Sequence, residues 1–385
     1  MKNKAWKILS YVLVALAAAG LTIVGCLLAG GVGGGGKLQE LEKLLSDRFI
    51  GEVDQKKLED YAAAAMVAAL DDRWSYYMTA EEYLAYQDAM SNSYVGVGIT
   101  VQAREDGQGI DITAVTAGAP AAEAGLQAGD RLIAVDGKSI IGKDLNAVSG
   151  IIRGKEGTKV KLTVNRAGKE QTFTVERRRF QTPVATGQML DGGVGLVTIE
   201  NFDDRCAQET IAAIESLRSQ GATSLIFDVR NNPGGYAHEL VKLLDYLLPE
   251  GEIFHTVDYL GREEVEYSDK SHLDMPMAVL VNLNSYSAAE FFAAALDEYD
   301  AAVIVGEKTF GKGYFQSTFE LSDGSAVALS IGKYYTPNGK SLAGVGLTPD
   351  VEKVVDEQTA AKIYAGTLDP KEDPQILAAI DALKN

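Results

Sequence analysis

The spacing of apolar and polar residues divides the chain into four stretches. Residues 8–30 are apolar or small and contain no charge. In residues 37–90 apolar positions recur at intervals of three and four, which predicts helices. Residues 94–177 carry short β-branched runs separated by turns, a pattern typical of a small, mostly β domain. From about residue 181 apolar strands alternate with helices, which predicts a mainly parallel sheet covered on both faces.

Individual elements follow from local signals within these stretches. Thr79, with Glu81 and Glu82 in the first turn after it, predicts a helix start. In the β-rich stretch we expect strands at residues 97–101, 110–112, 131–137, 160–164 and 172–175, and helices at 120–125 and 145–152. Farther on we expect strands at residues 195–199, 225–229, 277–281 and 303–305, and helices at 206–218, 237–248, 288–299 and 374–383.

The predicted fold class is therefore multidomain α+β. Its 385 residues are enough for two or three globular units. We expect, in order, a segment with a transmembrane helix, a helical arm, a β-rich domain with two helices, an α/β core and a closing helical segment. The expected bounds are residues 1–36, 37–93, 94–177, 178–350 and 351–385.

The uncharged stretch near the N-terminus predicts a transmembrane helix. Residues 8–30 number 23, close to the ~20 that cross the apolar core of a bilayer. Lys2, Lys4 and Lys7 precede the stretch, so we expect a cytoplasmic N-terminus and an extracytoplasmic body. A single-pass anchor in the cell membrane is preferred, because a cleaved signal peptide usually has an apolar core of only ~7–15 residues.

Two other forms of processing fit the same stretch. The small residues 17–19 are typical of a cleavage site, and residues 23–26, which end at Cys26, resemble the lipobox of bacterial lipoproteins. All three interpretations place the body of the chain outside the cytoplasm. Residues 30–36 are nearly all glycine and predict a flexible tether.

Composition and charge narrow the function classes. Apolar residues make up 46% and charged residues 23%, which is normal for a folded chain. The formal net charge is −18 and no basic stripe is present, so nucleic-acid binding is not expected. Three histidines and two cysteines, Cys26 and Cys206, form no metal-binding motif. We therefore expect neither a metal nor a cofactor, and no structural disulfide.

The β-rich stretch has the features of a domain that captures peptide ends. Gly96 and Gly98 stand just before a predicted strand, where backbone amides can gather around a carboxylate. With Val97 and Ile99 they are the expected peptide-binding residues, because the strand edge that follows can accept an extended peptide. Residues 120–137 resemble the helix, turn and strand of PDZ domains. Taken alone, the two glycines also fit a plain hairpin.

Ser287 is the candidate nucleophile. It lies between a predicted buried strand and a helix, at the carboxyl edge of the sheet, where open α/β folds place their sites. The amide of Ala288 comes next, at the helix N-terminus, and can stabilise a developing oxyanion. The alternative interpretation is that Ser287 only caps the helix.

Lys312 is the candidate base, since no histidine stands in a recognisable triad motif. A lysine accepts a proton only when neutral, and lowering its pKa from ~10.4 to ~7 takes about 4–5 kcal/mol of desolvation. Glycines on both sides allow close backbone packing around Lys312, and Gln316 would hold the amine from the same face of an extended strand. Lys308 is a competitor beside Glu307, and a solvated surface lysine is the alternative for Lys312.

A second oxyanion donor is expected in residues 228–236. Asn231-Asn232-Pro233-Gly234-Gly235 follows a buried strand and predicts a tight turn. The amide of Gly234 or Gly235 would serve as the donor. The alternative is a plain connection between strand and helix.

Together these motifs resemble one family, the carboxyl-terminal processing, or tail-specific, serine peptidases. The resemblance covers almost everything beyond the predicted anchor. Besides the PDZ-like run, it rests on residues 72–77 (Asp-Arg-Trp-Ser-Tyr-Tyr), 81–83 (Glu-Glu-Tyr), 335–340 (Tyr-Thr-Pro-Asn-Gly-Lys) and 346–350 (Gly-Leu-Thr-Pro-Asp). It implies a PDZ domain joined to a serine protease core.

The resemblance also assigns roles. In that family the nucleophile is the middle serine of a Ser-Ala-Ser-Ala-Ser-Glu run, which here reads Ser-Tyr-Ser-Ala-Ala-Glu over residues 285–290 and selects Ser287. The base is the lysine of Phe-Gly-Lys-Gly, which selects Lys312, followed by Gln316. The chain departs from the family pattern at Tyr286 and Ala289, which concerns the substrate pocket more than the activity.

Regulation and assembly are implied by the resemblance alone. Family members couple the PDZ domain to the protease through an arginine, for which Arg153 is the candidate here, with a plain surface charge as the alternative. The helical arm implies a homodimer. Loosely folded or tagged envelope proteins, or a regulatory membrane protein, are the implied substrates.

The sequence thus predicts a membrane-anchored, extracytoplasmic serine endopeptidase of the carboxyl-terminal processing type. Ser287 and Lys312 would form its dyad, and its PDZ domain would bind exposed C-termini of substrates or activators that end in small or apolar side chains. Two alternatives stay open: a catalytically silent PDZ scaffold, and a Ser-His-Asp hydrolase with His238 as base.

Overall fold

The computed structural model describes residues 35–104 and 106–384, and the chain forms two units divided between Ala69 and Leu70. The described part of the first unit holds α2 (Gly35–Arg48) and α3 (Gln55–Ala68). Asp54 caps α3 by accepting a hydrogen bond from the Lys57 amide. Large apolar side chains of this unit are exposed: Leu38, Leu41, Leu44, Phe49, Ile50, Tyr61 and Met66.

The predicted membrane span, residues 8–30, lies outside the described residues, as do Cys26 and most of the glycine tether. Within residues 35–104 and 106–384, no helix is both long enough and apolar enough to cross a bilayer.

The second unit contains the predicted β-rich domain, with its sheet strands in the order β3-β4-β5-β7-β8 and β6 paired to β5. The strands are β3 (Ile99–Ala103), β4 (Ile110–Val115), β5 (Arg131–Val135), β6 (Lys138–Ser139), β7 (Lys159–Arg166) and β8 (Lys169–Glu176). Helices α5 (Pro120–Ala124) and α6 (Leu145–Ile152) accompany them, as predicted. Among the described strands β3 pairs with β4 alone, so one of its edges is available to an added strand.

A two-stranded ribbon lies at the two ends of this domain. β2 (Ser93–Gly96) pairs antiparallel with β9 (Arg178–Gln181). Near the ribbon, the side-chain amide of Asn92 donates to the side chains of Asn201 (2.9 Å) and Asp203 (2.8 Å). These hydrogen bonds connect the ribbon to the α/β core.

The core is a six-stranded sheet in the order β10-β11-β12-β15-β16-β19, with every pair parallel except β10–β11. The strands are β10 (Ala185–Leu190), β11 (Val194–Ile199), β12 (Ser224–Asp228), β15 (Met277–Val281), β16 (Ala302–Gly306) and β19 (Val351–Glu352). The mainly parallel sheet predicted from the sequence is confirmed.

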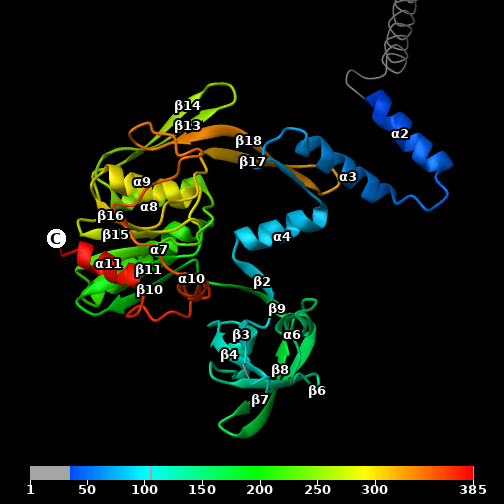
Figure 1. Cartoon of the computed structure of the whole chain (residues 1–385), viewed down its shortest axis with the longest axis horizontal. Helices are drawn as coiled ribbons and strands as arrows, with labels where there is room; N and C mark the ends of the chain where they lie inside the picture. Colours follow the sequence, from blue (N-terminus) through cyan, green and yellow to red (C-terminus); the bar gives the residue numbers. More distant parts are fainter. Residues whose placement is uncertain (1–34, 105, 385) are drawn as a thin grey trace, which may run out of the picture. The chain divides into compact units, whose positions relative to one another are not determined.

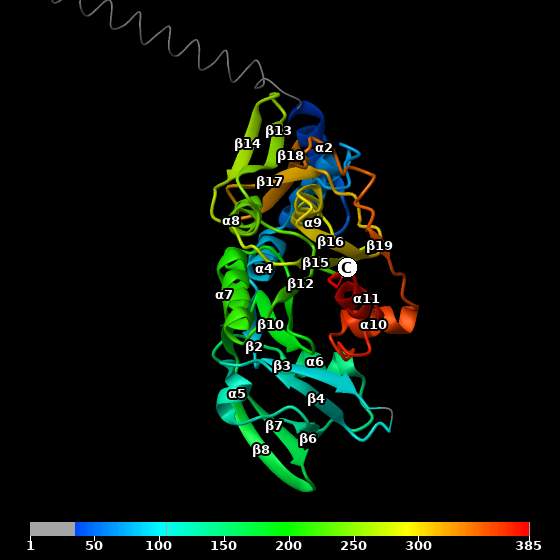
Figure 2. The same cartoon turned by 90° about the vertical axis from the view of Figure 1, so that its left-hand side faces the viewer.

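Helices cover both faces of this sheet (Figure 1). On one face lie α7 (Cys206–Ser219), α8 (Ala237–Leu247) and α9 (Ala288–Glu298); on the other lies α11 (Pro374–Ala382), preceded by α10 (Glu357–Tyr364). Figure 2 shows α7 and α11 on opposite sides of the sheet. In β12, Leu225 and Phe227 join the first apolar cluster and Ile226 the second, as the alternation of side chains along a strand requires.

A second, antiparallel sheet was not predicted. It has the order β1-β18-β13-β14, with β17 also on β18. The strands are β1 (Tyr76–Met78), β13 (Gly251–Asp258), β14 (Glu263–Ser268), β17 (Tyr314–Glu320) and β18 (Ala326–Tyr335). β1 interrupts the stretch predicted to be helical and is followed by α4 (Ala80–Met90), which starts at Thr79 as predicted. By pairing with β18, β1 brings residues 72–75 beside the catalytic candidates.

Candidate active site

Ser287 stands at the junction of the buried strand β15 and helix α9, as the N-cap residue. Its φ of 58° lies in the left-handed region that L-residues rarely adopt, and the residue is 7% exposed. The turn is held by Ser285, whose hydroxyl donates to the Val229 carbonyl (2.7 Å) and accepts from the Asn282 amide (3.0 Å). A serine in a strained strand-to-helix turn is typical of nucleophiles on α/β folds.

Lys312 is half-buried just before β17. Burial lowers the pKa of its amine below the ordinary value, against the opposing charges of Glu290 and Asp72. The Nζ atom lies 4.8 Å from the ring centroid of Trp74 and 5.9 Å from that of Tyr286. Among the described residues no hydrogen bond joins the side chains of Lys312 and Ser287.

Glu290 links the backbones of these two residues. Its Oε2 accepts hydrogen bonds from the amides of Ser287 (3.0 Å) and Lys312 (2.8 Å), and its Oε1 accepts from the Thr309 hydroxyl (2.6 Å) and the Gly311 amide (2.6 Å). The side chain is fully buried, which raises the pKa of its carboxyl. Sequence reasoning assigned Glu290 no role beyond its place in the family motif, although its spacing from Ser287 is that of a capping box.

The loop of Lys312 depends on close backbone contacts. A Cβ placed on Gly313 would lie 2.6 Å from the Ala343 nitrogen, so only glycine fits there. This agrees with the predicted use of the flanking glycines.

Gln316 does not contact Lys312. Its amide donates to the Tyr314 carbonyl (3.3 Å) and the Ser330 hydroxyl (3.2 Å). Lys312 precedes the start of β17, and a bulge falls between Phe315 and Gln316, so the two residues do not share one face of a regular strand.

The predicted oxyanion donors lie together beside Ser287. A Cβ on Gly234 (φ +85°) would lie 2.7 Å from the Ser287 Cβ and 2.8 Å from the Ala288 nitrogen. The Gly234 amide itself donates to the Asn232 side chain (2.8 Å). The amides of Gly235 and Ala288 donate no hydrogen bond within the described chain. These two amides are therefore the candidate donors to an oxyanion.

Asn232 is a positioning residue that sequence reasoning missed. It is buried, its side-chain amide donates to the Ile199 carbonyl (2.7 Å), and its backbone carbonyl accepts from the Tyr286 amide (3.2 Å). Since it also accepts from Gly234, it fixes the glycine turn against the Ser287 turn. The Asn-Asn-Pro-Gly-Gly run was its only sequence signal.

Trp74 also belongs to the site. Its ring packs edge-on against Phe310, with centroids 5.5 Å apart, and Arg73 stacks over both rings. Tyr286 also contacts Phe310, at 5.5 Å between centroids. The amine of Lys312 thus lies near two aromatic rings, those of Trp74 and Tyr286.

The geometry around Ser287 does not support His238 as its general base. His238 lies 3.3 Å from Asp204 and stacks on Tyr236, half-exposed, and makes no contact with Ser287 within the described residues. Over residues 35–104 and 106–384, no group of histidine, cysteine and acidic side chains is arranged to hold a metal.

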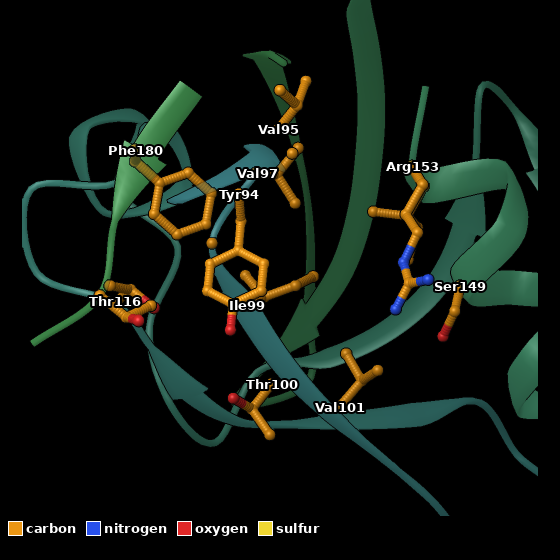
Figure 3. A pocket seen from close by; sticks show the side chains of 14 residues that line it. Tyr94, Val95, Val97, Ile99, Thr100, Val101, Thr116, Ser149, Arg153 and Phe180 are labelled. Atoms are coloured by element: carbon orange, nitrogen blue, oxygen red, sulfur yellow. The ribbon is translucent and has the colours of Figure 1, made fainter. Parts of the chain in front are cut away.

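The predicted peptide-binding residues line a groove of about 630 Å³. Gly96, Val97, Gly98 and Ile99 form part of its wall beside the free edge of β3. Figure 3 shows Tyr94 and Phe180, from the β2–β9 ribbon, on one side and Arg153 with Ser149 on the other.

Arg153 closes the groove on the side of α6. It is exposed, and its guanidinium forms no ion pair within the described residues. It is therefore free to meet an anionic group in the groove.

Comparisons with known proteins place these sites in context. Residues 193–353 match the model of peptidase family S41, and residues 112–166 match a PDZ domain. The chain is 36% identical over 320 residues to the carboxy-terminal processing protease CtpA of Bacillus subtilis (strain 168), covering 82% of this chain and 68% of that protein.

Two further proteins are similar over most of the chain. A carboxyl-terminal-processing protease of Synechocystis is 34% identical over 348 residues, which cover 88% of this chain and 80% of that protein. The solved structure of a photosystem II D1 C-terminal processing protease superposes with a TM-score of 0.50 at 26% identity, covering 88% of this chain and 92% of the other.

Proposed function

The chain belongs to peptidase family S41, as a serine-type peptidase of the carboxy-terminal processing group with a PDZ domain, and we propose that it cleaves proteins through a Ser287–Lys312 dyad. The observation that carries the proposal is the environment of Lys312. Its amine is half-buried among aromatic rings, its pKa is lowered by burial, and its backbone shares one carboxylate oxygen with that of Ser287.

Neutral Lys312 takes the proton of the Ser287 hydroxyl as the oxygen attacks the peptide carbonyl. The amides of Ala288 and Gly235 stabilise the tetrahedral oxyanion. Protonated Lys312 then gives its proton to the leaving amine as the peptide bond breaks, which leaves an acyl-enzyme on Ser287. Water hydrolyses the ester, with Lys312 again accepting a proton, and free Ser287 is restored. Side-chain rotation must first carry Nζ from Trp74 to the hydroxyl.

The groove of the PDZ domain would select the substrate or an activator. The glycine-rich residues 96–98 would hold the terminal carboxylate by their backbone amides, and the peptide would add to the free edge of β3. The apolar wall formed by Val97 and Ile152 favours a small or apolar last side chain.

The cellular setting is also a proposal. Residues 8–30 would anchor the chain in the cell membrane with its catalytic body outside the cytoplasm, where envelope or membrane proteins would be its substrates. The exposed apolar side chains of α2 and α3 would pair with those of a second copy in a homodimer.

The test is cleavage of an unfolded reporter with an apolar C-terminus, followed by sequencing of the products. We expect activity from the wild type and none from Ser287→Ala or Lys312→Ala. A Ser287→Ala protein that cleaves as fast as the wild type would overturn the nucleophile. Loss on His238→Ala but not on Lys312→Ala would favour a histidine base, and inactivity of every form with or without a C-terminal peptide would favour a scaffold.

A further inference from the structure

One fully buried side chain beside the proposed dyad has no chemical step of its own. The Glu290 carboxylate accepts four hydrogen bonds of 2.6–3.0 Å, and three of them come from backbone amides. These donors belong to the Ser287 turn and to the loop of residues 309–312. The two segments also meet directly, since the Phe310 amide donates to the Ser285 carbonyl (3.2 Å), but Glu290 is the side chain that accepts from the amides of both Ser287 and Lys312.

The pattern of donors requires an ionised carboxylate. Each oxygen faces two donors, and the backbone amides cannot turn away. The Thr309 hydroxyl accepts a hydrogen bond from the Leu347 amide (2.7 Å), so its own proton is directed to Glu290. A glutamine at this position would point the N–H groups of its side-chain amide, in either orientation, at one or more of the backbone N–H donors, which would then lack an acceptor. An aspartate would be too short to reach both pairs of donors.

We propose that Glu290 is a positioning residue of the dyad, which holds the backbone of the nucleophile and the backbone of the base on one carboxylate oxygen. The inference rests on the proposed function, since it assigns Glu290 the alignment of that same pair. Because side chains project from those two anchored residues, loosening either anchor changes where the hydroxyl and the amine can meet. A displacement of about 1 Å costs on the order of 10²-fold in rate.

The charge of Glu290 also affects the pKa of Lys312, which provides a second test of the proposed role. Lys312 is faced by Glu290 from α9, by Asp72 from the segment before β1, and by the rings of Trp74 and Tyr286, with Arg73 stacked on Trp74. The two carboxylates favour the ammonium form and burial favours the neutral amine. Removing the charge of Glu290 therefore lowers the pKa of Lys312 further, so the neutral base persists to lower pH.

The experiment uses the full chain and compares wild type with Glu290→Gln and Glu290→Asp. We expect Glu290→Gln to lower kcat at least tenfold with KM within about twofold, and to move the acid limb of kcat/KM to lower pH. Glu290→Asp keeps the charge, so it should lower kcat while the limb stays close to that of the wild type. The rate at which a fluorophosphonate labels Ser287, measured against pH, gives the same information without a peptide substrate.

Glu239→Gln is the matched control. Glu239 is also buried, at 1% exposed, and accepts a hydrogen bond from the Ala207 amide (2.8 Å), but it contacts neither member of the dyad. We expect it to lower the melting temperature without moving the acid limb. Melting curves and binding of a C-terminal peptide to the groove verify that each variant is folded.

The outcomes separate the inference from the proposed function. If Ser287→Ala abolishes cleavage and Glu290→Gln keeps the kcat and acid limb of the wild type, only the role of Glu290 is overturned. If Glu290→Gln does not fold, Glu290→Asp decides, because wild-type kcat in that shorter variant contradicts alignment by Glu290. If Ser287→Ala stays active, the dyad itself is wrong.

Discussion

At the scale of single residues, the most restrictive position is Gly234. Its positive φ and its contacts leave no room for a side chain, because a Cβ would overlap the space between Ser287 and the Ala288 amide. That space is where the oxyanion of the proposed reaction must lie. The glycine is therefore required by the site and not only by the turn.

We expect Gly234→Ala to lower cleavage at least about 100-fold, because the methyl group occupies the oxyanion position. Gly324→Ala is the control, since Gly324 also has φ +85° but faces no atom closer than 3.6 Å. Gly324→Ala should lose roughly 1–2 kcal/mol of stability from the left-handed backbone, and Gly234→Ala should lose more, because its Cβ would also lie within 2.8 Å of neighbouring atoms. Comparable activity in the two variants would show that Gly234 matters only for folding.

We expect Lys312 to couple activity and stability to pH. Its pKa in the folded chain lies below the ordinary 10.5, because burial disfavours the ammonium. At pH values between the pKa of the folded chain and that of the unfolded chain, the unfolded chain binds more protons than the folded chain. Lys312 therefore lowers the stability of the fold at neutral pH, and this loss of stability shrinks as the pH rises. We expect Lys312→Met to be more stable than the wild type at pH 7, with the difference shrinking as pH approaches 10.5.

Chemical denaturation of both proteins at a series of pH values measures this difference. A constant gap between them would contradict the lowered pKa. In the wild type, kcat/KM should rise with pH over the range in which Lys312 loses its proton.

At the scale of elements, the sequence predicts what local signals encode. The strands and helices of the core have long apolar runs. α4 starts at Thr79 because Thr79 and Glu82 cap one another. The Thr79 amide donates to the Glu82 carboxylate (2.9 Å), and the Glu82 amide donates to the Thr79 hydroxyl (3.3 Å). β1 escaped prediction because it has three residues and depends on a segment far along the chain: it pairs with β18, and Met78 packs with Ala326 and Ala328.

The same distinction separates the site residues that were predicted from those that were not. Ser287, Lys312 and the glycine turn carry sequence motifs, so the sequence alone could propose them as site residues. Trp74 and Asn232 also lie in sequence motifs, but they contact segments distant in sequence, and the motifs do not indicate those contacts. Gln316 was predicted from the family resemblance and from the face of a regular strand, and the bulge beside it breaks that regularity.

Thr79→Ala tests the junction of β1 and α4. Loss of the cap should cost about 1 kcal/mol of stability, because the Glu82 amide loses its acceptor. Ser91→Ala is the control at the other end of α4, where the hydroxyl donates to the Asp88 carbonyl (3.1 Å) but caps no amide. Equal melting temperatures for the two variants would contradict the role of the cap.

At the scale of the second unit, the peptide groove joins the PDZ domain to the rest of the chain. Tyr94 and Phe180 project into the groove from the β2–β9 ribbon. Asn92, beside that ribbon, donates a hydrogen bond to Asp203 of the core. A peptide in the groove would thus contact the PDZ domain and its connection to the core at once. This continuity gives binding a physical route to the catalytic core.

Phe180→Ala tests the contribution of that ribbon to recognition. We expect the affinity for a peptide with an apolar C-terminus to fall about tenfold, or by about 1.4 kcal/mol, because an aromatic wall of the groove is lost. Fluorescence anisotropy of a labelled peptide measures the change. The same peptide with an amidated C-terminus is the control: it should bind weakly to wild type and variant alike, since the amides of residues 96–98 would then face no carboxylate. Undiminished binding of the amidated peptide would show that the groove holds an internal segment of its ligand and not the chain end.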